Sequence, residues 1–276
     1  MTMTTGEVRE MPQIKSVDLP TGATLQYAEQ GDSAGRPVLF LHGFSDSWHS
    51  FEPLMRHLPS AIRVLAPTQR GHGDSSRPER HYRPADFAAD AAAFLDALDV
   101  PAAVVVGHSM GGTIAQRLAI DHPRRVSALC LVGAFHSLAN SKAAQELAGV
   151  IEQMEGPVDR DFVREFQKST IIRPVPQAFF ETAVQESMKM PARVWKGVLA
   201  DMRDDFSFDL HKIAAPTLLV WGEQDGFVPR SDQDAQLAAI PGSRLRVYEG
   251  TGHAVHWEQP ERFARDLMSF MEEKPN

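Results

Sequence analysis

A serine that could act as a nucleophile lies near the middle of the chain, at Ser109. It is the central residue of a Gly-x-Ser-x-Gly motif, which follows an apolar, β-branched run at 104–106 and precedes a helical pattern at 110–121. In a nucleophile elbow the serine lies on a tight strand-to-helix turn, where small neighbours are required and the helix N-terminus faces the reacting group. The strand, the small residues and the helix are all present in the sequence. We therefore predict that Ser109 is a nucleophile.

A serine hydroxyl needs a base and an orienting carboxylate before it attacks a carbonyl at neutral pH. After a nucleophile elbow, the acid and then the histidine are expected in chain order. Asp225 and His253 lie in the loops that follow the last two predicted strands. Glu223 and His256 are the nearest alternatives for the acid and the base. Asp225 lies farther out from its strand, and Gly252 lets the chain fold toward the serine, so we predict Asp225 and His253.

Attack on a carbonyl creates an oxyanion, which backbone N–H groups must stabilise. One donor is expected from Met110, the residue directly after the nucleophile. The second is expected from Phe44, in the loop after the predicted strand 37–42, where Gly43 allows a close approach.

The elements that would hold these residues alternate between strand and helix patterns, which favours a mostly parallel sheet with helices on both faces. Strands are predicted at 13–19, 24–29, 37–42, 62–66, 102–107, 126–132, 216–221 and 244–249. Helices are predicted at 49–58, 84–98, 110–121, 231–239 and 260–271. The alternation stops within 135–211, which contains helical patterns broken by proline. We predict an α/β core of residues 1–134 and 212–276, with residues 135–211 inserted as a helical cap.

Composition excludes several classes of function. The formal charge of −8, from 28 basic and 36 acidic residues, argues against a nucleic-acid partner. No apolar run is long enough to span a bilayer, and the polar residues 1–13 do not resemble a signal peptide. Cys130 is the one cysteine and has no internal partner for a disulfide. We expect a cytoplasmic protein that binds neither membrane nor nucleic acid.

Histidine is also the commonest ligand of transition metals, and three histidines lie near the predicted site. His42, His72 and His108 are not spaced as a ligand set, and no cluster of cysteine or acidic residues accompanies them. We expect no metal site and no cofactor.

Five motifs together resemble the α/β-hydrolase fold superfamily, namely residues 42–44, 70–75, 107–112, 222–229 and 252–260. The resemblance covers nearly the whole chain. It implies an eight-stranded α/β-hydrolase fold and a serine esterase-like or lactonase-like member with a helical cap. It also implies an acyl-enzyme formed on Ser109 without a cofactor.

Other reactions of this superfamily fit less well. Residues 42–48 resemble the His-Gly-Phe-Pro-Glu-Ser-Trp motif of epoxide hydrolases, but those enzymes use an aspartate where this chain has Ser109. They also use tyrosines of the cap, whereas the tyrosines of this chain, Tyr27, Tyr82 and Tyr248, lie outside 135–211. Carbon–carbon bond hydrolases typically carry a Gly-Pro-Gly loop where this chain has residues 45–47.

Three alternatives stay open, and carbon–carbon bond hydrolysis is one of them. Cofactor-free haloperoxidases, which act as perhydrolases, share the Ser-Met-Gly-Gly elbow. A low-turnover signalling receptor of the same fold is disfavoured by the complete set of nucleophile, acid and base.

The expected substrate is a small to medium, largely apolar ester or lactone. Large apolar side chains in and near the cap would form its pocket, since ligand pockets are mainly apolar. The predicted wall residues are Trp48, Phe135, Trp195 and Val228.

Overall fold

An eight-stranded sheet forms the centre of the computed structural model, which describes residues 11–135, 142–202 and 207–273. The strands are β1 (Gln13–Asp18), β2 (Thr24–Gln30), β3 (Arg36–Leu41), β4 (Ile62–Pro67), β5 (Ala103–His108), β6 (Val126–Val132), β7 (Thr217–Gly222) and β8 (Arg244–Tyr248). Their order is β1-β2-β4-β3-β5-β6-β7-β8. β1 and β2 run antiparallel to their neighbours, and β4 to β8 pair in parallel. All eight predicted strands are confirmed.

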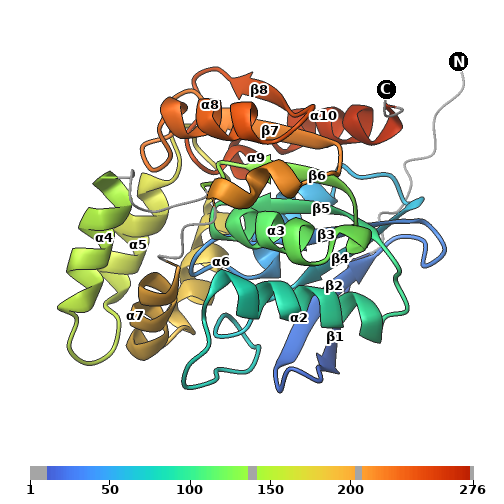
Figure 1. Cartoon of the computed structure of the whole chain (residues 1–276). Coiled ribbons are helices and arrows are strands. Elements are labelled where there is room, and N and C mark those ends of the chain that lie inside the picture. Colours follow the sequence, from blue (N-terminus) through green and yellow to red (C-terminus); the bar gives the residue numbers. More distant parts are fainter. Residues whose placement is uncertain (1–10, 136–141, 203–206, 274–276) are drawn as a thin grey trace, which may run out of the picture.

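Helices cover both faces of this sheet (Figure 1). On one face lie α2 (Pro84–Ala97), α3 (Met110–Asp121) and α8 (Arg230–Ala239), and on the other lie α1 (Glu52–Met55) and α10 (Pro260–Glu272). Because successive strand side chains point to opposite faces, Val105 packs in the layer of α3 while Val104 and Val106 pack in the layer of α10. A strand buried on both faces must be apolar throughout, which explains the unbroken apolar run before the serine.

Several short helical segments complete the core outside the main helices. They are η1 (Trp48–Phe51), η2 (Pro123–Arg125), η4 (Ser207–Lys212) and α9 (Val255–Glu258). The single helix predicted at 49–58 is wrong, because η1 is followed there by the separate four-residue α1. Pro53 lacks an N–H and is tolerated only in the first turn of a helix, so it separates the two pieces.

The segment between β6 and β7 contains α4 (Lys142–Glu152), α5 (Arg160–Ser169), α6 (Gln177–Met188) and α7 (Ala192–Asp201). Figure 1 shows these helices gathered at one end of the sheet. No strand occurs in the described part of this segment, residues 142–202. The division of the chain into a core and a cap unit, with the bounds given above, stays a prediction.

Among the helices of the described residues, none has the length and apolar character needed to cross a membrane. The expectation that residues 1–13 are not a signal peptide concerns a segment of which residues 1–10 lie outside the described residues.

Candidate active site

Ser109 occupies a strained turn between β5 and α3. Its backbone has φ 51° and ψ −117°, a conformation that residues with a side chain rarely adopt. Its N–H donates to the carbonyl of Val132 on β6 at 2.9 Å, which holds the turn against the neighbouring strand. A Cβ on Gly107 would come within 2.3 Å of the Gly111 carbonyl, and one on Gly111 within 2.0 Å of the Leu41 carbonyl. Both glycines are therefore required for the turn.

A buried aspartate–histidine pair lies at the ends of the last two strands. The Nδ1 of His253 is 2.8 Å from the Oδ2 of Asp225, whose side chain is fully buried. The other oxygen, Oδ1, accepts hydrogen bonds from the N–H groups of Phe227 at 2.8 Å and Val228 at 2.9 Å. These bonds fix the carboxylate, and the carboxylate in turn orients the imidazole. His253 and Ser109 line the same cavity.

The alternatives for the acid and the base have other contacts. Glu223 accepts a hydrogen bond from the Gly250 N–H at 3.1 Å and is exposed. His256 is buried, with its Nε2 3.0 Å from the Ser50 Oγ. Of the two candidate acids, Asp225 is thus the one in contact with His253.

The two predicted oxyanion donors come from different loops. Met110 begins α3, where the first N–H groups have no partner inside the helix, and Phe44 follows β3. Both residues line the cavity, and neither backbone N–H donates to any residue that the structure describes. The loop before Phe44 is held by His42, whose Nε2 accepts from the Gln69 N–H at 2.9 Å. Burial and the neighbouring His72 hold the pKa of His42 well below its ordinary value, so this imidazole is a neutral structural group.

The cavity above Ser109 encloses about 710 Å³ when its open mouth is included, which suits a small ligand. Most of its wall is apolar. That apolar part consists of Phe44, Met110, Phe135, Leu147, Phe166, Val198, Leu199, Met202, Phe227, Val228 and Trp257. Phe135 and Val228 line the cavity as predicted from the sequence.

Trp48 and Trp195 do not line this cavity, which corrects the placement predicted for them. Trp48 is buried in the layer of α10 and stacks on His49, with ring centroids 3.8 Å apart. Trp195 is fully buried behind the wall, where its indole N–H donates to the Met190 carbonyl at 3.1 Å. Its ring packs edge-on against Phe44 at 4.8 Å, so it supports the wall from behind.

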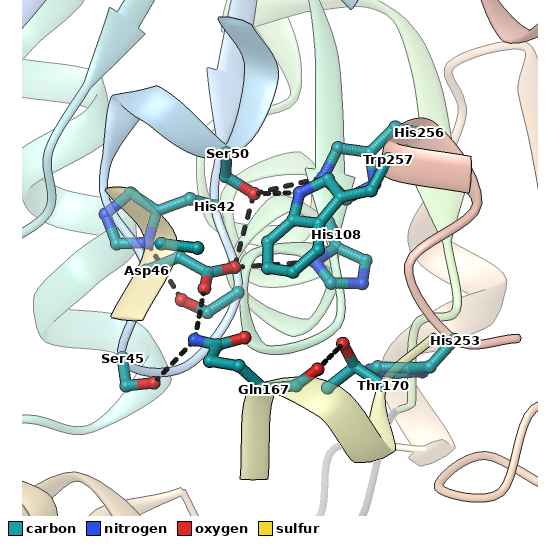
Figure 2. A network of polar contacts seen from close by, with 12 residues as sticks. His42, Ser45, Asp46, Ser50, His108, Gln167, Thr170, His253, His256 and Trp257 are labelled. Carbon is teal, nitrogen blue, oxygen red and sulfur yellow. Dashed lines mark hydrogen bonds and ion pairs between the residues drawn. The ribbon is translucent and has the colours of Figure 1, made fainter. Parts of the chain in front are cut away.

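One end of the cavity is polar and was not predicted from the sequence; Asp46, His108, Gln167 and Thr170 contribute to it (Figure 2). The Oδ1 of Asp46 accepts from Gln167 Nε2 at 3.0 Å, and its Oδ2 accepts from Ser50 Oγ at 3.2 Å. Burial and neighbouring histidines hold the pKa of His108 well below its ordinary value, so the ring is neutral. No spacing rule indicates this group, because α5 brings Gln167 to a loop far away in the sequence.

The buried carboxyl of Asp46 should make the free energy of unfolding depend on pH. Burial raises its pKa from an ordinary value of 3.8 to about 6, against hydrogen bonds that act in the opposite direction. Between these two values the folded state binds the extra proton, so this group's contribution to stability falls as the pH rises toward and past 6. We expect the free energy of unfolding of Asp46→Asn, relative to the unmodified protein, to rise by about 1 kcal/mol between pH 5 and pH 7.5.

Urea unfolding at the two pH values measures this difference. The exposed carboxylate Asp234, paired with Arg230 on the surface, provides the control Asp234→Asn, for which we expect a change below about 0.5 kcal/mol. An equal change in both variants would contradict the buried origin of the effect.

The C-terminal end of α5 is tied to the loop that carries His253. The Ala254 N–H donates to the Thr170 carbonyl at 3.0 Å. The Glu258 carboxylate accepts from the N–H of Gly252 at 2.9 Å and of Arg173 at 2.7 Å. The same end of α5 reaches Asp46 through Gln167. Asp46 belongs to residues 42–47, the loop that carries Phe44 and is the predicted oxyanion loop, so one helix end contacts both loops of the site.

The chain matches the model of a known family. The family model for the α/β hydrolase fold matches residues 36–260, and the chain belongs to this family.

Similar proteins carry several activities in their names. A pimeloyl-[acyl-carrier protein] methyl ester esterase of Neisseria meningitidis is 30% identical, covering 87% of this chain and 94% of that protein. A non-heme chloroperoxidase of Streptomyces lividans is 29% identical, covering 93% of this chain and 99% of that protein. Among solved structures, an esterase from Rhodococcus sp. ECU1013 superposes with a TM-score of 0.84 at 26% identity, covering 94% of this chain and 98% of that one.

Proposed function

We propose that this protein is a serine hydrolase that cleaves carboxylic ester or lactone bonds of small to medium, largely apolar substrates. The observation that carries the proposal is the convergence on one apolar cavity of Ser109, on its strained turn, with the oriented pair of His253 and Asp225. Binding alone does not require a base held beside a nucleophile. The esterases among the similar proteins support the same reaction class.

The proposed reaction is acyl transfer in two steps. The Ser109 Oγ attacks the carbonyl carbon while the Nε2 of His253 takes the serine proton, and Asp225 stabilises the imidazolium. The N–H groups of Phe44 and Met110 stabilise the oxyanion of the tetrahedral intermediate. The C–O bond then breaks, and His253 gives the proton to the departing alcohol. Water, deprotonated by His253, hydrolyses the acyl-enzyme and releases the acid.

Perhydrolysis is the second candidate, favoured by the similarity to a chloroperoxidase across 93% of this chain. In that reaction hydrogen peroxide replaces water at the acyl-enzyme and the product is a peracid. A comparison of ester hydrolysis with peracid formation from acetate and peroxide separates the two. Peracid formation without ester hydrolysis would favour the second candidate.

Covalent trapping tests the nucleophile directly. An alkyl fluorophosphonate reacts with an activated serine, so we expect one adduct, on the peptide that contains Ser109, and loss of turnover of 4-nitrophenyl butanoate in parallel. Peptide mass spectrometry locates the adduct, and His253→Ala should suppress labelling because the base is lost. Turnover that survives complete labelling of Ser109, or an adduct confined to another serine, would refute the proposal.

A further inference from the structure

We infer that the polar end of the cavity binds a hydroxyl group on the alcohol part of the substrate. This inference rests on the proposed ester hydrolysis and names its substrate class, an apolar acyl chain esterified to a short hydroxylated alcohol. The binding group is the polar recess, defined as Asp46, His108, Gln167 and Thr170, each less than one-tenth exposed and each lining the cavity.

The orientation of the Gln167 amide is fixed by its partners. Its Nε2 donates to Asp46 Oδ1 at 3.0 Å and to Ser187 Oγ at 2.8 Å. The Ser187 hydroxyl donates to the Ala183 carbonyl at 2.9 Å, so toward Gln167 it can only accept. The amide nitrogen must therefore face these groups. The amide oxygen is left over, and it accepts no hydrogen bond from the residues that the structure describes.

The other members of the recess also offer acceptors. The Thr170 hydroxyl donates to the Gln167 backbone carbonyl at 2.7 Å, which leaves its lone pairs available. Gln167, Ser50 and the backbone of Gly43 donate to the Asp46 carboxylate, and within the described ranges no lysine or arginine lies within 4.0 Å of it. Three acceptor groups thus face one small space. A carboxylate or an ester carbonyl would be repelled there, whereas a group with an O–H would be bound.

His108 adds a polar ring at the base of the recess. Its Nδ1 lies 4.0 Å from Asp46 Oδ2, the ring also faces the backbone of His253, and neither ring nitrogen makes a hydrogen bond of ordinary geometry with the described residues. A neutral imidazole carries one donor and one acceptor. A hydroxyl, which both donates and accepts, complements this combination better than an alkyl group, because buried polar groups left unpaired cost free energy.

The position of the recess assigns the hydroxyl to the alcohol side of the ester. In the proposed reaction His253 protonates the departing oxygen, so the alcohol must lie next to this imidazole. Figure 2 shows Thr170 beside His253, and the ring centroids of His108 and His253 are 4.9 Å apart. The apolar wall from α4 and α7, which includes Leu147 and Leu199, is left for the acyl chain.

Two esters that differ only at one terminal group test this inference. 2-Hydroxyethyl butanoate and propyl butanoate share the acyl chain and nearly the same alcohol size, with a hydroxyl in place of a methyl. We expect kcat/KM, followed by acid release, to favour the hydroxyethyl ester by about tenfold, the effect of one net hydrogen bond to a buried site. Gln167→Met and Thr170→Val, which keep side-chain size and remove acceptors, should each bring the ratio toward one.

The ratio of kcat/KM for the two esters separates recognition of the hydroxyl from a structural role, since a general loss of activity lowers both rates together. Leu199→Ala on the apolar wall is the matched control and should change both rates while keeping the ratio. A ratio near one in the unmodified protein, or a ratio that neither Gln167→Met nor Thr170→Val changes, would overturn the inference and leave the proposed ester hydrolysis intact. Failure to hydrolyse any ester, including 4-nitrophenyl butanoate, would instead overturn the proposed function.

Discussion

Replacing Ser109 with alanine should lower kcat for ester hydrolysis by roughly 10⁴-fold or more, to the background of the assay. The reason is that the proposed acyl-enzyme forms on the Ser109 hydroxyl, which the variant lacks. Initial rates with 4-nitrophenyl butanoate measure the loss. Circular dichroism and urea unfolding check that the variant is folded.

The same position offers a matched control for the strained turn. Ser109→Gly is expected to be as inactive as Ser109→Ala but more stable, by about 1 kcal/mol, because glycine tolerates the positive φ of 51° at little steric cost. Urea unfolding of the two variants compares them directly. Ester hydrolysis retained in both variants would rule out Ser109 as the nucleophile, and equal stability would argue against strain at the elbow.

Asp225→Asn should lower kcat by about 10⁴-fold with little change in KM, through the tautomer of His253. The Oδ1 position accepts two backbone N–H groups, so the asparagine oxygen must take that position and its NH₂ must face His253. The Nδ1 of the imidazole would then accept a hydrogen bond, and the proton would move to Nε2. A histidine protonated on Nε2 cannot take the serine proton.

The second carboxylate of the same loop provides the control for this variant. The Glu223 carboxylate bonds only the Gly250 N–H among the contacts found in the described chain, so Glu223→Gln should change kcat less than about threefold. Steady-state kinetics of both variants across pH 5–9 measure the contrast. A large loss in Glu223→Gln with a small loss in Asp225→Asn would exchange the roles assigned to the two acids.

The sequence was sufficient for the strands and for the residues at strand ends. A strand buried on both faces shows an unbroken apolar run, and the residues that follow such a run are confined to one edge of a parallel sheet. This confinement is why Phe135 and Val228, which lie shortly after β6 and β7, line the cavity as predicted.

Residues held by distant packing were harder to predict. Trp195 has the apolar character of a pocket residue, but the helical pattern does not indicate whether its buried face meets the cavity or the aromatic layer behind it. In the sequence, Asp46 and Gln167 look like ordinary polar residues, because their hydrogen bond depends on how α5 packs against the oxyanion loop. Only the packed structure contains that information.

The attachment of α5 suggests how this enzyme could be diversified. Its C-terminal end is bonded to the oxyanion loop through Gln167 and to the histidine loop through Thr170, whereas Leu147 of α4 and Val198 of α7 contribute apolar side chains to the wall. Substitutions on α4 and α7 can therefore reshape the space proposed for the acyl chain while the contacts of α5 with the two loops stay in place. A library confined to these two helices is the most direct route to altered chain-length preference, and one that includes α5 should contain many inactive variants.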